Sequence, residues 1–159
     1  MRSVPALLLP AIAGVLLLAG CAGPPPVDEA ALHAWEKRQR AVESNAELGV
    51  LFAAVSPGDD DSDDPGTGVT ITFPHPEPVD HLEFSCFGDG HMSGSFTIGS
   101  AGASQTRPTE PMSCRDGSQR IDLPPELRRR ADSVSFNGID SDRDSAWYVR
   151  IIAAEPVQD

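Results

Sequence analysis

The stretch that decides the fold is HLEFSC at residues 81–86, in which polar and apolar residues alternate. Successive side chains of a β-strand point to opposite faces, so this alternation predicts a strand with one face on a core. Leu82, Phe84 and Cys86 share the predicted inner face. His81 belongs to the opposite phase, and we expect it to point outward.

Further short runs with a period of two follow along the chain. They are residues 49–55, 69–73, 92–98, 121–123 and 134–136. Residues 146–152 are apolar on both faces, which predicts a central strand. Gly, Pro, Asn and Asp clusters separate the runs, as turns require. The chain is therefore expected to be mainly β: an antiparallel, jelly-roll-like β-sandwich over residues 49–159.

One α-helix is expected before the sandwich, over residues 28–48. Asp28 is a suitable N-cap and Gly49 a suitable terminator. The predicted apolar face carries Leu32, Trp35, Val42 and Ala46. The polar Gln39 interrupts this face, so we favour packing of the helix on the sandwich over a coiled coil with a partner helix.

The N-terminal segment predicts export and anchoring. Leu18-Ala19-Gly20-Cys21 follows a short apolar run and resembles the lipobox of bacterial lipoproteins. Residues 1–20 are then a signal peptide, because the apolar run is short for a transmembrane helix and holds two prolines. The resemblance implies a diacylglyceryl group on Cys21, which anchors the chain on the extracytoplasmic side of the membrane. Residues 21–27, with three consecutive prolines, form an extended spacer.

Two cysteines remain after Cys21. An exported chain meets an oxidising compartment, so we expect Cys86 and Cys114 to form a disulfide, with two buried thiols as the alternative. Two cysteines without C-x-x-C spacing make a zinc site improbable. The net charge of −12 argues against nucleic acid as a partner. No cofactor is expected.

Two acidic clusters have the composition of a metal site. In each of them, an ordinary solvated loop or turn is the favoured interpretation. The acidic run 59–64 is interpreted as a solvated loop. Asp140, Asp142 and Asp144 match the D-x-D-x-D sequence at the start of an EF-hand calcium loop. The match then ends, because Ser145 and Ile151 occupy the positions where an EF-hand needs glycine and glutamate. We therefore predict a turn at residues 140–144. The three aspartates remain weak candidates for metal ligands.

The basic, histidine, serine and aromatic side chains give no assigned catalytic residue and a few candidates for sugar binding. The triplet 128–130 is interpreted as a basic turn. The histidines show no metal-binding spacing, and no G-x-S-x-G motif marks a nucleophile, so no catalytic residue is assigned. Trp35, Trp147 and Tyr148 are weak candidates for stacking on sugar rings.

The whole arrangement resembles small secreted lipoproteins of actinobacteria. The resemblance is carried by the lipobox, the Pro-rich spacer, and the motifs FSCFGDG (84–90), MSCRDG (112–117) and AWYVRI (146–151). The architecture is also similar to galactose-binding-like jelly rolls, which implies glycan binding only by analogy. The expected function is a non-enzymatic envelope lipoprotein that binds an envelope protein or glycan. The alternatives are a glycan- or calcium-dependent binding protein and, third, an envelope hydrolase.

Overall fold

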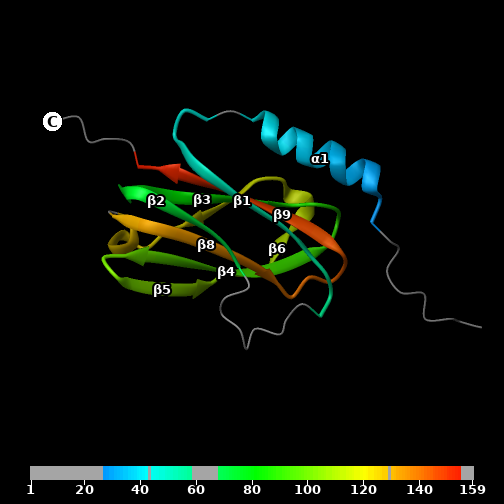
Figure 1. The fold of residues 1–159 in the computed structure, drawn as a ribbon. Coiled ribbons are helices and arrows are strands. Elements are labelled where there is room, and N and C mark those ends of the chain that lie inside the picture. The colour runs from blue at the N-terminus through cyan, green and yellow to red at the C-terminus, as the bar shows by residue number, and fades with distance from the viewer. Residues whose placement is uncertain (1–26, 43, 59–67, 129, 155–159) are drawn as a thin grey trace, which may run out of the picture.

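A computed structural model describes residues 27–42, 44–58, 68–128 and 130–154. One α-helix precedes a set of strands, with two short 3-10 helices between them (Figure 1). The elements are α1 (Glu29–Ala41), β1 (Glu47–Val55), β2 (Val69–Glu77), β3 (Val79–Cys86), β4 (His91–Ser100), β5 (Ala103–Pro108), β6 (Met112–Ser113), η1 (Cys114–Asp116), β7 (Gln119–Asp122), η2 (Pro125–Leu127), β8 (Ala131–Ile139) and β9 (Ser145–Ala153).

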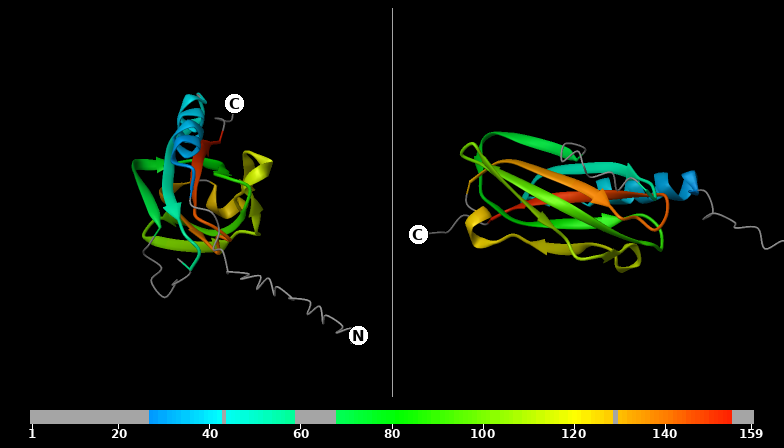
Figure 2. Two further views of the ribbon diagram at one scale, coloured as in Figure 1. Left: turned by 90° about the vertical axis from the view of Figure 1, so that its right-hand side faces the viewer. Right: turned by 90° about the horizontal axis from the view of Figure 1, so that it is seen from below.

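The strands form two antiparallel sheets that face each other (Figure 2). One sheet has the order β1-β9-β3-β7, and the other has the order β2-β8-β4-β5 with β6 paired to β4. Consecutive strands cross repeatedly between the sheets, which is the winding of a jelly roll. The predicted β-sandwich class is confirmed.

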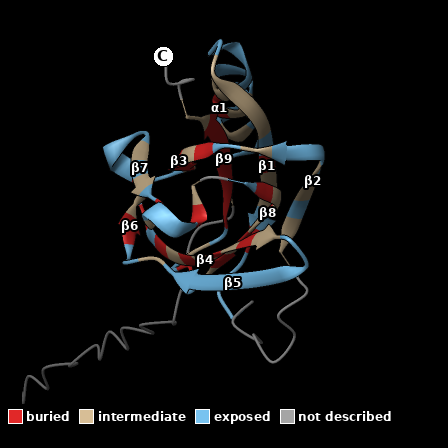
Figure 3. Ribbon diagram, turned by 90° about the vertical axis from the view of Figure 1, so that its left-hand side faces the viewer, coloured by how far each residue is buried: buried red, intermediate tan, exposed pale blue. Residues whose placement is uncertain are grey.

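The core lies between the two sheets, where β1, β3, β4, β8 and β9 bury their inward side chains (Figure 3). Strand β5 is exposed along its whole length, and the inward residues of β2 and β7 are only partly buried. The predicted inner face of β3 is confirmed, since Leu82, Phe84 and Cys86 are all buried. Phe136 is the centre of an aromatic cluster: its ring centroid lies 5.5 Å from that of Phe84 and 5.0 Å from that of Trp147. The expected central strand is β9, which pairs with β1 on one side and β3 on the other.

Helix α1 begins as predicted but ends well before residue 48. The Asp28 carboxylate accepts a hydrogen bond from the Ala31 N–H at 3.1 Å, which confirms the N-cap. Val42 is already extended, and Ser44 then closes a turn by accepting hydrogen bonds from Ala46 and Glu47. Serine competes in this way with helical hydrogen bonding.

Consequently two residues assigned to the apolar helix face lie beyond the helix. Val42 is 54% exposed, and Ala46 belongs to the turn. The role predicted for Gly49 is also wrong, because Gly49 lies inside β1. A Cβ at this position would stand 2.6 Å from Ile71 Cδ1, so glycine allows β1 to approach β2.

The helix packs on the outer face of the β1-β9-β3-β7 sheet, which confirms intramolecular packing. Trp35 is the buried residue of α1, and it clusters with Ala146 and Tyr148 of β9. Its ring lies 5.9 Å from that of Phe87. The helix therefore covers the outer face of β9, which agrees with the apolar residues on both faces of that strand.

Within the described part of the chain, no helix has the length and apolarity needed to cross a membrane. The predicted signal peptide, the predicted lipidation site Cys21, the predicted spacer to residue 26 and the acidic run 59–64 lie outside the described residues.

Candidate functional site

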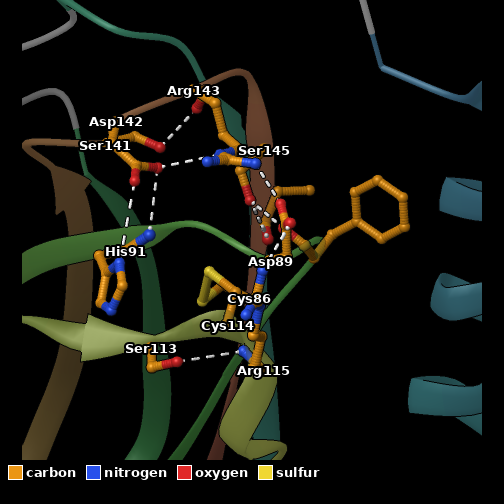
Figure 4. A network of polar contacts seen from close by, with 12 residues as sticks. Cys86, Asp89, His91, Ser113, Cys114, Arg115, Ser141, Asp142, Arg143 and Ser145 are labelled. Atoms are coloured by element: carbon orange, nitrogen blue, oxygen red, sulfur yellow. Dashed lines mark hydrogen bonds and ion pairs between the residues drawn. A yellow bond between two sulfur atoms is a disulfide. The ribbon is translucent and has the colours of Figure 1, made fainter. Parts of the chain in front are cut away.

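A disulfide joins Cys86 at the end of β3 to Cys114 in η1, as predicted (Figure 4). Their Cα atoms are 4.7 Å apart, and both residues are buried. The bond holds the β6–η1 segment against the edge of the sandwich. It lies beside a polar network at this end of the molecule.

The polar network joins the β3–β4 loop, the β8–β9 loop and η1. The Asp89 carboxylate accepts a hydrogen bond from Arg115 at 2.9 Å and also contacts the Arg143 guanidinium. Asp142 accepts from the backbone N–H of His91 at 3.1 Å and from Arg143 Nε at 3.2 Å. Each carboxylate of the network is thus already matched by cationic or N–H donors.

The electrostatics of the network follow from these donors. The hydrogen bond from Arg115 and the charge of Arg143 lower the pKa of Asp89. Burial raises the pKa of Asp142, but the His91 N–H and Arg143 outweigh it and the net pKa is lowered. Both carboxylates are therefore held in the ionised form by the protein itself.

The three aspartates kept as metal candidates do not gather into a cation site. Asp142 faces Arg143, Asp144 is exposed, and Asp140 sits in a turn with φ of 51°. Among the described residues, no three His, Cys, Asp or Glu side chains are placed to share a metal ion.

The serines around this network bond to backbone groups. Ser141 Oγ donates to the Arg143 carbonyl at 2.6 Å, and Ser145 Oγ donates to the Phe87 carbonyl at 2.7 Å. Ser113 Oγ accepts from the Arg115 N–H at 3.3 Å. These bonds fix loop shape, and the hydroxyl groups are engaged in that task.

His81 follows the predicted outward phase but is not solvated, since only 9% of it is exposed. Its Nδ1 lies 2.8 Å from the Asp80 carboxylate, and its Nε2 lies 3.7 Å from Glu83. The hydrogen bonds with His81 and Arg120 lower the pKa of Asp80. The outward direction is thus as predicted, and His81 is buried because neighbouring charged side chains cover this face.

The basic triplet is likewise more engaged than a solvated turn. Arg128 Nε donates to the Leu123 carbonyl at 2.7 Å, and its guanidinium lies 3.6 Å from Asp80. Arg130 is exposed, and Arg129 lies outside the described residues.

The three aromatic candidates for sugar stacking are all buried. Trp147 lies in the core against Phe136, while Trp35 and Tyr148 lie between α1 and the sheet. Burial also raises the pKa of Tyr148. Sugar stacking needs a free ring face, so these residues provide no platform for it.

A concave surface suited to a ligand lies at the side of the sandwich where β5 and β7 are the outermost strands. It is a groove of about 400 Å³. Its floor contains Phe96 and Met112, and Ile121 lies on the β7 wall. The remaining lining residues are Arg107, Pro108, Thr109, Glu110, Gln119, Arg120, Asp122 and Pro124.

The charges on the rim of this groove fall into two groups. On the β7 wall, Arg120 bonds to Asp122 at 2.7 Å and to Asp80 at 2.9 Å, so these charges compensate one another. Those two carboxylates raise the pKa of Arg120. On the opposite wall, Arg107 and Glu110 are exposed, and within the described part of the chain neither makes an ion pair.

The groove was not predicted from the sequence. Phe96 was expected in the core, and Arg107, Glu110 and Gln119 had no assigned role. The available signal was the Pro-rich segment between β4 and β7, with prolines at 108 and 111, which ends β5 and turns the chain away from the sheet.

No protein-family model matches this chain, and no curated protein matches it significantly.

Proposed function

We propose that the protein is a cell-envelope lipoprotein whose sandwich is a binding module without enzymatic activity. The groove between β5 and β7 is its ligand site. The observation that supports this is an open, mostly apolar concavity with a few polar groups on its rim. Its volume of about 400 Å³ falls within the range typical of ligand sites.

Binding is favoured over catalysis by the state of the polar side chains. A general acid or base must reach a substrate, and a nucleophile needs an adjacent base. His81 is held between two carboxylates, and Ser141 and Ser145 of the polar network bond to backbone carbonyls. The groove holds neither a histidine nor a serine in its lining.

Ligand binding through the groove is tested by site-specific photocrosslinking in intact cells. A photoreactive amino acid replaces Arg107 in the groove or, as a matched control, the exposed Lys37 on α1. We expect discrete adducts from position 107 and none from position 37. Equal labelling from both positions, or none from position 107, contradicts the proposal.

The membrane anchor is tested separately by Cys21→Ser. The expected result is loss of acyl mass from residue 21 and release of the mature chain from the membrane fraction, because two acyl chains hold a protein stably. Wild-type protein that carries no acyl group on Cys21 rules out the lipoprotein assignment and leaves the groove proposal standing.

Absence of enzymatic activity is tested with the full chain against cell-wall glycans, esters and peptides. We expect no turnover above buffer. Hydrolysis that disappears in His81→Ala or His91→Ala, with the fold retained by circular dichroism, would establish an enzyme instead.

A further inference from the structure

The four lateral edges of the two sheets differ in how they meet solvent. A free edge presents unpaired backbone N–H and C=O groups, which attract another strand unless the edge is protected. The edges of β1 and β2 lie together, and partly buried Leu48, Val69, Ile71 and Phe73 close that side. Strand β2 also carries Pro74 and Pro76, which cannot donate a ladder hydrogen bond.

On the other side, β5 and β7 are the outermost strands. Strand β5 ends in Pro108, and only Arg107 and Pro108 of this strand line the groove. Strand β7 contains no proline, and it pairs with β3 along one edge only. Of the four edges, that of β7 is therefore the one that combines a strand free of proline with a groove beside it.

The lining of the groove shows that it runs along the backbone of β7. All four residues of the strand, Gln119–Asp122, line it. Side chains of a strand alternate between its faces. In the register with β3, Ile121 pairs with the inward Leu82, while Arg120 pairs with the outward Glu83. A surface that touches both phases of one strand must follow its edge.

The wall opposite this edge is fixed before any ligand arrives. The Gln119 side chain donates to the Ser113 carbonyl at 2.7 Å, and the Cys86–Cys114 disulfide holds the next residue. A preorganised site loses less conformational entropy on binding. The exposed Arg107 and Glu110 stand on this side without ion-pair partners in the described part of the chain.

We propose that the groove binds an extended peptide of a partner protein, which adds as a fifth strand to the edge of β7. This inference rests on the proposed function and names its ligand class. The peptide backbone pairs with Gln119–Asp122, and alternate apolar side chains enter the groove over Phe96 and Met112. Its charges complement the opposite wall: an acidic side chain meets Arg107 and a basic one meets Glu110.

The test uses the full chain in detergent micelles and an array of blocked heptapeptides. Each peptide has apolar residues at alternate positions and carries one aspartate and one lysine, in either order. The tightest binder is then titrated into isotope-labelled protein. We expect the largest amide shifts at Gln119–Asp122. The same peptide with every inner amide N-methylated keeps its side chains but cannot pair as a strand, and it should not bind.

Charge reversal tests the proposed complementarity. Arg107→Glu should weaken the selected peptide roughly two- to five-fold, as expected for an exposed ion pair. A peptide with lysine in place of that aspartate should recover the loss. The matched control is Arg38→Glu on the exposed face of α1, which should leave affinity unchanged. Because Arg107 is exposed, its replacement does not threaten the fold.

Three results would overturn strand addition: equal binding of the N-methylated peptide, shifts centred away from β7, or no binder in the array. The photocrosslinking experiment separates this failure from that of the proposed function. If position 107 gives adducts in cells but no peptide adds to β7 in vitro, the groove is a ligand site for another class of molecule. If the peptide binds to β7 in vitro but position 107 gives no adducts in cells, the proposed function is wrong. Strand addition to β7 is then still supported.

Discussion

Arg150 connects helix α1 to the sheet, although it lies in a strand that is otherwise apolar. It is only 6% exposed. Its guanidinium donates to the carbonyl of Gln39 in the last turn of α1 and stacks 5.6 Å from the centre of the Tyr148 ring. Nε lies 3.3 Å from the Glu47 carboxylate, but the alignment does not make a hydrogen bond. A cation beside the C-terminal carbonyls of a helix is favourable.

Arg150→Ala should therefore lower the free energy of unfolding by about 1.5–3 kcal/mol, because a charged donor to the partly buried Gln39 carbonyl is lost. Urea denaturation of the two proteins measures the difference. The control is Arg107→Ala, an exposed arginine without an ion pair in the described region, which should change stability by less than about 0.5 kcal/mol. Equal effects of the two substitutions would remove the special role of Arg150.

The disulfide is the second strong constraint at the level of single residues. Its cysteines are 28 positions apart, and the chain-entropy relation gives a stabilisation of about 3–4 kcal/mol for such a loop. The double variant Cys86→Ala, Cys114→Ala should unfold at a correspondingly lower urea concentration. In wild-type protein exported from cells, both thiols should resist alkylation until a reductant is added.

Helix α1 is held by few contacts compared with the strands. Trp35 is its buried residue, and the other apolar contact to the sheet cluster comes from the partly buried Leu32. An isolated helix of this length is marginal in water. The order of α1 thus depends on tertiary contacts at Trp35 and at the Gln39 carbonyl.

Trp35→Ala should loosen α1 while the sandwich stays folded. The local free energy of opening should fall by about 1.5–3 kcal/mol, the value for burying one large apolar side chain. Hydrogen exchange of the α1 amides measures this opening, and exchange in β9 should change little. Val42→Ala, at an exposed position just after the helix, is the matched control. A uniform increase of exchange through both sheets would contradict local opening.

The elements differ in how far the sequence predicts them. The alternating residues predicted β3 and β4 correctly, and Asp28 predicted the start of α1 correctly. Both signals are local, because they depend only on residues close together in the sequence. The end of α1 could not be predicted, since apolar residues at 42 and 46 continue a helical spacing that the Ser44 turn interrupts. Arg150 was overlooked in an apolar run, because its burial depends on a helix more than 100 positions away.

At the scale of the molecule, the surface carboxylates make stability depend on pH. The pKa values of Asp80, Asp89 and Asp142 lie below the ordinary value of 3.8. A carboxyl group with a lowered folded-state pKa binds protons more readily when unfolded. Its contribution is therefore complete above about pH 4 to 5 and is lost as the pH falls through the lowered values.

We expect the thermal midpoint to be flat near neutral pH and to fall below about pH 4. Asp80→Asn should flatten the acid limb of this profile. Asp116→Asn, which removes an exposed carboxylate without an ion pair in the described part, should leave the limb unchanged. High salt should reduce the effect, because these groups are solvent-screened. A midpoint that rises on acidification would contradict the assignment.

The groove could not be predicted from the sequence because it depends on which strands are outermost. Phe96 of β4 and residues 119–122 of β7 lie in different sheets and line one groove only through the order of the strands in the two sheets. Periodicity reports whether a strand has a buried face, but it does not report the neighbours of that strand. The aromatic candidates for sugar stacking were wrong for the same reason: their burial depends on which elements pack against them. The two sheets and α1 cover their rings.

The weak attachment of α1 has a mechanical consequence. A force that pulls on the N-terminus acts first on α1, whose contacts with the sheet are few and lie one after another along its length. Strand β1, which follows, is held to β9 by a ladder from Glu47 to Val55. Under tension α1 should peel away and lengthen the connection while the sandwich stays intact. In that state we expect α1 to act as an extensible link between the N-terminal segment and the sandwich.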